Sequence, residues 1–445
     1  MNTYDRKYLK IALPAALEGL FMILLASTDL IMVGALGALS IAAVSIFLQP
    51  RLILLCFSRS LASSVTLLVS QNAGSGHQKE ATDIMKKSLF LCAIFMAILH
   101  ILFYIFLEDI FYLMGANSEY MAEAMAYGPI ALISVYVTSL TLILQALQLG
   151  YGKTAVIMKT NVCGNIVNVI LNALLIFGLG PIPRLGITGA AIGTLVSTLF
   201  TLCWTTYILK QEKFFEGGSY LPNKKYFKML LPLLCSILSE QGSERIGMVL
   251  FGRMAAGLGT IPFAVHSICM NICDVYYDFI MGFGKASMVT AGQSCGKGSE
   301  EDWRGYKRSG FKWSLILSTI VCAAIIFFRQ DIFALYSNDP NSMEMASVIM
   351  IFVAVVSFPE AHAILSAGIL RGSGKAAQVA GYSFFSITFL RPLMTAFFLY
   401  VLNLGLIGAW CALLLDQIIR ASCATFLLYR AHQKGWRALL MGTGC

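Results

Sequence analysis

Apolar stretches of 18 or more residues recur from one end of the sequence to the other, and they constrain the fold more than any other feature. A helix of this length crosses the ~30 Å hydrocarbon core of a bilayer. The strands of a membrane barrel would alternate apolar and polar residues, which these stretches do not do. The chain is 58% hydrophobic and 12% charged, whereas soluble proteins average roughly 45–50% and about 25%. The sequence therefore predicts an all-α polytopic membrane protein.

Twelve transmembrane helices are predicted, with the longest polar linker between the sixth and the seventh. Their expected ranges are 11–33, 41–70, 88–107, 127–149, 155–177, 187–209, 229–254, 263–290, 313–328, 347–370, 376–401 and 406–428. The predicted domains are an N-terminal six-helix lobe (1–209), a cytoplasmic linker (210–228), a C-terminal six-helix lobe (229–428) and a cytoplasmic tail (429–445). The first apolar run is too long for the core of a signal peptide, so we expect it to remain as a helix.

Lysine and arginine are distributed very unevenly among the loops. The N-terminus, every second loop and the C-terminal tail hold 22 of these residues, and the alternate loops hold only Arg184 and Arg329. Because cytoplasmic loops carry the excess of positive charge, both termini are predicted to be cytoplasmic in a cell inner membrane. The net charge of +9 is then a topology signal, and no nucleic-acid partner is expected.

An internal repeat relates the two halves of the sequence. A shift of 222 residues places Ala35-Leu36-Gly37 on Gly257-Leu258-Gly259 and Gly150-Tyr151-Gly152-Lys153 on Gly372-Ser373-Gly374-Lys375. A shift of 219 aligns the stretches that begin at Leu185 and Leu404. Since each half holds six spans, an even number, both halves have the same orientation. We expect two lobes related by an axis along the membrane normal.

Several motifs resemble those of bacterial-type transporters of the multidrug and toxic compound extrusion (MATE) family, which belongs to the MOP flippase superfamily. They are the run from Thr28 to Gly37, the two Gln-x-x-Gly-x-Gly loops at Gln71 and Gln293, the segment from Ile176 to Ala191, and Leu370-Arg371-Gly372-x-Gly374. Their order spans essentially the whole chain. The resemblance implies a transporter of two six-helix lobes that exports organic compounds.

Ionisable residues inside the predicted spans are the candidates for chemistry, because each costs at least ~2.5–3.5 kcal/mol at the bilayer centre. The acidic ones are Glu18, Asp29, Glu240, Glu244, Asp274, Asp278, Glu360 and Asp416. Asp29 has no base three or four residues away on either side, so a carboxylate there can exchange a cation as water access changes. Asp416 and Arg420 are one turn apart and are expected to form an ion pair.

The family resemblance assigns Asp29 to a cation site of the N-terminal lobe, together with polar residues of the fifth helix. Asn168 and Asn172 are the residues that match here. Many family members carry aspartate where Asn172 stands, and asparagine can coordinate Na⁺ but cannot release a proton. A polar seam that only packs helix on helix is the alternative.

In the C-terminal lobe, the resemblance places cation ligands at Glu240 and Glu360, which makes Na⁺ possible there. Carboxylate oxygens are hard ligands of the kind that hard cations prefer. Pairing with buried arginines such as Arg391 is the alternative for both. Asp274 and Asp278 share a helix face and could hold a proton between them, and a structural role for this pair is equally open.

These observations predict an antiporter that expels amphipathic, often cationic organic compounds with a Na⁺ or H⁺ gradient. No phosphate-binding loop or hydrolase motif is present in the sequence, so we expect no enzyme and no cofactor other than the coupling ion. A flippase for lipid-linked oligosaccharide stays open, because Arg51, Arg59 and Arg391 could line a cationic cavity. The expected partners are small organic molecules, the coupling ion and membrane lipids, and the expected state is a monomer.

Overall fold

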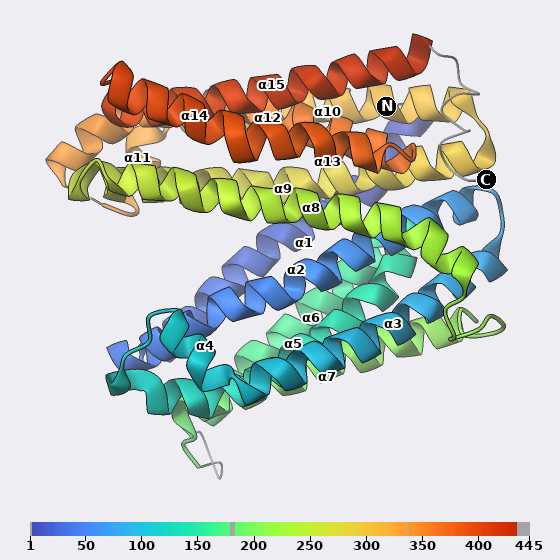
Figure 1. Ribbon diagram of the computed structural model, residues 1–445, viewed down its shortest axis with the longest axis horizontal. Helices are drawn as coiled ribbons and strands as arrows, with labels where there is room; N and C mark the ends of the chain where they lie inside the picture. Colours follow the sequence, from blue (N-terminus) through green and yellow to red (C-terminus); the bar gives the residue numbers. More distant parts are fainter. Residues whose placement is uncertain (1, 179–182, 338, 434–445) are drawn as a thin grey trace. The chain divides into compact units, whose positions relative to one another are not determined.

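The computed structural model describes residues 2–178, 183–337 and 339–433, and within these ranges it contains helices and turns but no strand. Twelve helical segments of 24 residues or more follow one another along the chain (Figure 1). They are α1 (Thr3–Gly34), α2 (Ala38–Gly74), α3 (Gln78–Ile105), α5 (Ser118–Gly150), α6 (Thr154–Phe177), α7 (Gly186–Gln211), α8 (Lys224–Ala256), α9 (Thr260–Lys297), α10 (Glu300–Phe327), α12 (Pro340–Gly372), the segment Ala376–Val401, and α15 (Gly405–Gln433). Two short helices, α4 (Leu107–Leu113) and α11 (Arg329–Ala334), lie between the long ones.

The helices have the length and surface of membrane-spanning elements. Within the described ranges, ten are long and apolar enough to cross a bilayer. The other two long helices, α8 and α9, contain 33 and 38 residues and hold several of the charged side chains discussed below. Large apolar side chains such as Ile105, Ile320 and Phe426 are exposed, as expected where lipid is the solvent. The predicted all-α fold of twelve transmembrane helices is confirmed.

Several helices extend well beyond the predicted spans. The span predicted at 127–149 belongs to α5, which begins at Ser118, and the span at 313–328 belongs to α10, which begins at Glu300. The side chains of Asn117 and Ser299 cap these two helices by accepting hydrogen bonds from backbone amides. Hydropathy marks only the part of a helix that lies in hydrocarbon, so the polar first turns were missed.

The repeat is visible in the helix boundaries. Adding 222 to the bounds of α3 gives those of α10, and adding 222 to the bounds of α5 gives the bounds of α12. The short helices obey the same shift, because α4 begins at Leu107 and α11 at Arg329. Gly37 and its repeat mate Gly259 have φ angles of 118° and 108°, which residues with a Cβ rarely adopt. Both halves therefore repeat one sequence of six long helices and one short helix.

The described chain divides into two compact units whose borders fall inside α1 and α8. One unit comprises residues 17–231, and we call it the N-terminal unit. The other comprises residues 1–16 together with the chain from Pro232 on, and we call it the C-terminal unit. The first half of α1 thus packs with the second half of the sequence, whereas the predicted domains divided the chain between α7 and α8. Pro14 and Pro232 lie within three residues of these borders.

Tyr8 anchors the first half of α1 in the C-terminal unit. Its hydroxyl donates to the carbonyl of Phe283 at 2.9 Å and lies 2.8 Å from the hydroxyl of Ser287, both on α9. Tyr8, Ala12 and Ala16 share an apolar cluster with residues of α9 and α12. Asp5 adds an ion pair to Lys312 at 2.8 Å. These tertiary contacts explain why the N-terminal sixteen residues group with the second half.

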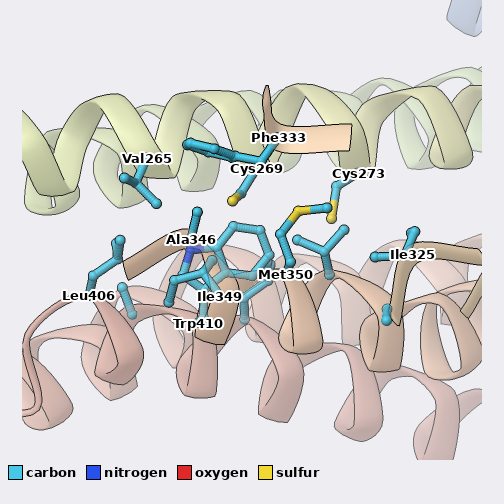
Figure 2. Packing of buried hydrophobic residues seen from close by; sticks show 14 of the residues in the cluster. Val265, Cys269, Cys273, Ile325, Phe333, Ala346, Ile349, Met350, Leu406 and Trp410 are labelled. Atoms are coloured by element: carbon cyan, nitrogen blue, oxygen red, sulfur yellow. The ribbon is translucent and has the colours of Figure 1, made fainter. Parts of the chain in front are cut away.

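A larger apolar cluster forms the middle of the C-terminal unit (Figure 2). Cys269 and Cys273 of α9 point toward Met350 of α12, and Trp410 of α15 lies beside Ile349. These side chains are buried and apolar, so the two cysteines act here as small hydrophobic residues.

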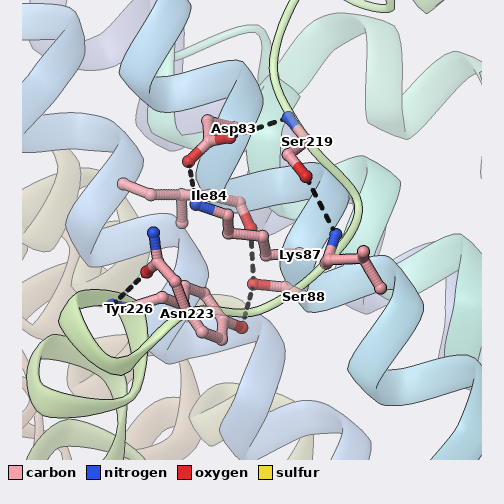
Figure 3. Close-up of polar contacts among 8 residues, drawn as sticks. Asp83, Ile84, Lys87, Ser88, Ser219, Asn223 and Tyr226 are labelled. Carbon is pink, nitrogen blue, oxygen red and sulfur yellow. Dashed lines mark hydrogen bonds and ion pairs between the residues drawn. The ribbon is translucent and has the colours of Figure 1, made fainter.

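The polar linker is fixed to α3 in the N-terminal unit (Figure 3). The ammonium group of Lys86 donates to the carbonyls of Phe215 and Gly217 at 2.7 and 2.5 Å. Asp83 accepts from the Ser219 amide at 2.9 Å, and the hydroxyl of Tyr226 lies 2.8 Å from that of Ser88. The linker therefore belongs structurally to the N-terminal unit, together with the first turns of α8.

Candidate functional site

The polar side chains of the N-terminal unit line the seam between α1 and α6. Among the described residues, three of the hydrogen bonds that cross this seam join residues 143 positions apart: Glu18 with Asn161, Met22 with Asn165, and Asp29 with Asn172. A constant separation means that the two helices run side by side in the same direction and in register. The seam places the polar face of α6 against both carboxylates of α1 in this unit.

Asp29 lies at the end of this seam nearest the C-terminal ends of α1 and α6, and amide groups donate hydrogen bonds to it. The side-chain nitrogen of Asn172 donates to one Asp29 oxygen at 3.0 Å. The Asn168 amide is oriented with its nitrogen toward the carboxylate, because the opposite orientation would set two oxygens against each other. In this orientation Asn168 donates to both Asp29 oxygens, at 2.7 and 3.0 Å, and accepts from the backbone amide of Thr194 at 3.2 Å.

One oxygen of this cluster is left over. Asn172 is 1% exposed, and its side-chain oxygen has no hydrogen-bond partner among the described residues. Gly193 of α7 makes room for it, since a Cβ at position 193 would collide with the Asn172 amide. A buried acceptor without a donor costs free energy unless a cation or water completes it. The three predicted residues Asp29, Asn168 and Asn172 are thus brought together around an unused acceptor.

Arg51 is the basic residue whose charge acts on the Asp29 carboxylate. It lies exposed on α2, and its positive charge acts on Asp29 and on the hydroxyl of Tyr127. No described lysine or arginine forms an ion pair with Asp29 itself. The carboxylate is therefore stabilised by amide donors and by a distant charge, and it remains available to a mobile cation.

Glu18 is a site residue that our sequence reasoning noted only as an acid within a span. The Asn161 amide donates to its carboxylate at 2.5 Å, and Gln145 of α5 donates to the Asn161 oxygen at 2.7 Å. The spacing of eleven residues between Glu18 and Asp29 was the available signal, since it returns to the same helix face after three turns. The second signal was the repeat, in which Glu18 is the mate of Glu240.

In the C-terminal unit, Glu240 is paired with an arginine. Its carboxylate accepts from Arg371 of α12 at 2.6 Å and from the hydroxyl of Ser383 at 3.2 Å. Glu360 lies eleven residues before Arg371 on the same helix, which is about 16 Å of helical rise. In the described part of the chain, Glu240 bonds to Arg371 and Ser383 and forms no hydrogen bond or ion pair with Glu360. Within the described ranges, no group of three or more His, Cys, Asp or Glu side chains is arranged to hold a metal ion.

Arg391 is neutralised by Asp416, which corrects the expected pair of Asp416 with Arg420. Two guanidinium nitrogens donate to one Asp416 oxygen at 3.0 and 2.5 Å, and the hydroxyl of Ser386 donates to the other. Arg391 is 3% exposed and also approaches the sulfur of Met248 at 3.4 Å. The charge of Arg420 still acts on Asp416, but without an ion pair at bonding distance.

The segment that carries Arg391 is not a regular α-helix. It is built from α13 (Ala376–Phe384), a π-helix η1 (Phe385–Leu390), α14 (Arg391–Ala396) and a second π-helix η2 (Phe397–Val401). Such widened turns occur in proteins frequently at functional sites. They were not predicted, because the pattern of apolar residues in 376–401 is the same for both kinds of helix.

Glu360, Asp274 and Asp278 contribute further negative charge to the C-terminal unit. Glu360 is 7% exposed, and the charges of Arg420 and Asp274 act on it. The charge of Asp278 acts on Asp274, as the spacing of one turn predicted. The three acids share an electrostatic neighbourhood on α9 and α12, and their use in ion binding remains a prediction.

Comparison with known proteins gives consistent matches along the whole chain. The family model described as MatE matches twice, over residues 14–174 and 232–397. The chain is 24% identical over 421 residues to "Probable multidrug resistance protein NorM" of Thermotoga maritima, covering 94% of this chain and 90% of that protein. It is 25% identical over 431 residues to "Multidrug resistance protein MdtK" of Pectobacterium atrosepticum, with 93% and 92% covered.

Solved structures share the fold at lower sequence identity. One, described as "Crystal structure of MATE in complex with MaL6", superimposes with a TM-score of 0.89 at 20% identity and covers 98% of both chains. Another, a MOP superfamily transporter from Pyrococcus furiosus whose description reports a reversed polarity of its binding pocket, gives a TM-score of 0.88 at 20% identity and covers 98% of this chain and 97% of the other. The two family-model matches fall one in each half of the sequence repeat.

Proposed function

The chain belongs to the MATE family of multidrug transporters, and from this premise we propose that it is a secondary antiporter. Its substrates would be amphipathic, often cationic organic compounds, and its energy source an inward gradient of Na⁺ or H⁺. The loop charges support a multi-pass inner-membrane protein with both termini in the cytoplasm. A monomer surrounded by membrane lipids is part of this proposal.

The arrangement around Asp29 is the observation that carries this proposal. A half-buried carboxylate beside Asn168 and Asn172, with one amide oxygen unused, offers oxygen ligands for a monovalent cation. A cation would bind here from the outside and be released to the inside, and its movement down the gradient would drive export of the substrate. Because Asn172 cannot titrate, we favour Na⁺ over H⁺ at this site, while Asp29 alone would suffice for a proton.

The acids of the C-terminal unit form a second group of proposed ion ligands, and they differ in whether an arginine already neutralises them. Arg371 already supplies the counter-charge of Glu240, so a cation would have to displace it. Glu360 forms no ion pair at bonding distance within the described ranges, and the negative charges of Asp274 and Glu244 act on it. The charge of Asp278 acts in turn on Asp274. We therefore place the main coupling site at Asp29 and assign Glu240 mainly to charge balance.

A flippase of lipid-linked oligosaccharide is the alternative function. It would need several cations facing one cavity to hold a pyrophosphate. Two buried arginines are engaged elsewhere, because Arg391 is bound to Asp416 and Arg371 to Glu240. Arg51 acts on Asp29, which leaves a weaker basis for anion binding. These pairings favour the multidrug antiporter.

The test is dye efflux measured with each ion gradient imposed separately. Inverted vesicles that contain the protein would receive ethidium together with either a Na⁺ gradient or a pH gradient of matched size. The proposal predicts accumulation of the dye with at least one gradient, and no accumulation with the Asp29→Asn variant. Accumulation by Asp29→Asn at the wild-type rate would refute a coupling role for Asp29. Net accumulation of the dye with neither gradient would refute ion-driven antiport.

A further inference from the structure

The α1–α6 seam holds two carboxylates at its two ends. Glu18 and Asp29 are eleven residues apart on α1, so they lie about 16 Å apart along the axis and within about 20° of one face. Asn161 and Asn172 have the same spacing on α6, and each donates to the carboxylate opposite to it. The two ends of the seam therefore repeat one motif, a carboxylate held by an asparagine.

Further asparagines connect the two ends. Asn165 donates to the sulfur of Met22 at 2.9 Å and to the backbone carbonyl of Asn161 at 2.9 Å. Asn168 follows one turn later and contacts Asp29. Positions 161, 165, 168 and 172 form one stripe on α6, since their spacings of four, three and four residues keep them on one side of the helix. Amide groups thus line the seam from Glu18 to Asp29.

Glu18 differs from its repeat mate in what neutralises it. Glu240 is bound to Arg371 and to Ser383, the latter 143 residues further along the chain. Glu18 is bound to Asn161, also 143 residues further along, and has no ion-pair partner within the described ranges. Asn161 and Ser383 are themselves repeat mates. At equivalent positions, Glu240 is therefore paired with an arginine side chain, whereas Glu18 is held by an uncharged amide.

We propose that Glu18 is a second binding station for the coupling cation, located between the Asp29 site and the cytoplasm. This inference rests on the proposed function and on the proposed orientation of α1. The cation would be a monovalent one, either Na⁺ or a proton, bound by the Glu18 carboxylate that Asn161 now holds. One positive charge leaves Asp29 and arrives at Glu18, so the total charge of the seam does not change. Glu18 would then release the cation toward the cytoplasmic end of α1.

The test compares two transport modes of the purified protein in proteoliposomes. The first is ethidium transport driven by a Na⁺ gradient or, separately, by a pH gradient. The second is exchange of labelled for unlabelled ethidium with no ion gradient, which does not require net release of the cation. The variants are Glu18→Gln and Asn161→Leu. The matched control is Glu119→Gln, which changes an exposed carboxylate in the first turn of α5.

We expect Glu18→Gln to lower gradient-driven transport by about tenfold, the loss typical when a group that supports an ion site is removed. Exchange should stay near the wild-type rate, and Asn161→Leu should show the same split. If Glu18→Gln loses transport driven by the Na⁺ gradient, the cation is Na⁺. If it loses transport driven by the pH gradient, the cation is a proton. Glu119→Gln should match the wild type in both modes, and thermal unfolding in detergent would verify that all variants are folded.

Two results would contradict the proposal that Glu18 is a second binding station for the cation. Both can be distinguished from failure of the proposed function. Loss of exchange together with gradient-driven transport in a folded Glu18→Gln protein would assign Glu18 a purely structural role. Wild-type behaviour of Glu18→Gln, combined with loss of coupling in Asp29→Asn, would show that the cation leaves Asp29 by another route. If instead Asp29→Asn itself retained gradient-driven transport, the proposed function would fail first.

Discussion

Glu18 and Glu240 occupy equivalent positions in the two halves of the chain, and each accepts a hydrogen bond from the side chain 143 residues further on. Asn161 is that donor for Glu18, and Ser383 is the donor for Glu240. The difference between the halves is Arg371, which pairs with Glu240 at 2.6 Å. A duplicated helix pair has thus kept its geometry while the charge around its carboxylate has diverged.

This pairing predicts the effect of removing the Glu240 charge. Glu240→Gln leaves Arg371 largely buried without its counter-ion, and breaking such a pair costs about 3–5 kcal/mol. The thermal unfolding temperature in detergent should fall clearly, and the double variant Glu240→Gln/Arg371→Gln should recover part of the loss. Added Na⁺ should stabilise the wild type and Glu240→Gln equally, because the main ion site lies at Asp29. Stabilisation by Na⁺ that disappears in Glu240→Gln would show that Glu240 is itself an ion ligand.

The ion pair of Arg391 and Asp416 gives a second stability prediction. Asp416→Asn should destabilise the protein by about 3–5 kcal/mol, because Arg391 is 3% exposed and would lose its only bonded carboxylate in the described contacts. The double variant Arg391→Met/Asp416→Asn should be more stable than Asp416→Asn alone, since no buried charge is then left over. The matched control is Asp331→Asn on the exposed surface of α11, which should change stability little. Equal unfolding temperatures for Asp416→Asn and Asp331→Asn would contradict the importance of this pair.

Gly193 tests the geometry around Asn172. A methyl group at position 193 would collide with the Asn172 amide, so Gly193→Ala should displace Asn172 from Asp29 and lower ion-driven efflux. Gly381→Ala is the matched control, because a Cβ at that helical glycine meets open space. An alanine there should be neutral or stabilise the helix by up to about 1 kcal/mol. Efflux rates of the two alanine variants would be measured in parallel. Wild-type rates for both would refute the claim that the position of Asn172 beside Asp29 matters for transport.

The loop charges predict which ends of the helices face outward. Cysteines introduced in place of Glu119, Lys79 and Lys224 lie at exposed positions in the first turn of α5, in α3 and at the start of α8. A membrane-impermeant maleimide should label Glu119→Cys in intact cells, and should label Lys79→Cys and Lys224→Cys only after permeabilisation. The unmodified protein provides the background from native cysteines. Labelling of Lys224→Cys in intact cells would reverse the assigned orientation.

Much of the fold followed from the sequence, because lipid imposes a simple rule. Long apolar segments must become helices, and the shift of 222 residues predicted that two halves repeat, as the bounds of α5 and α12 confirm. The borders of the two units did not follow. They depend on side-chain contacts such as those of Tyr8 with α9, which hydropathy does not encode.

The candidate site was only partly predictable for a similar reason. Asp29, Asn168 and Asn172 were identified from residue type and family resemblance, and they lie together. The partner of Asp416 was predicted wrongly as Arg420, because spacing along one helix cannot reveal an arginine that approaches from a neighbouring helix. The same limit applied to Arg371 as the partner of Glu240. How each helix is rotated about its axis decides these pairs, and tertiary packing sets that rotation.

The central claim, that Asp29 binds the ion that drives export, is tested most directly by measuring both fluxes at once. Proteoliposomes loaded with ethidium would be placed in medium with ²²Na⁺, or with an external pH indicator, and dye exit and cation entry would be followed together. The wild type should take up cations as the dye leaves, and Asp29→Asn should show neither dye-dependent cation entry nor cation-dependent dye exit. Cation entry that accompanies dye exit in Asp29→Asn, at the wild-type ratio, would contradict the account.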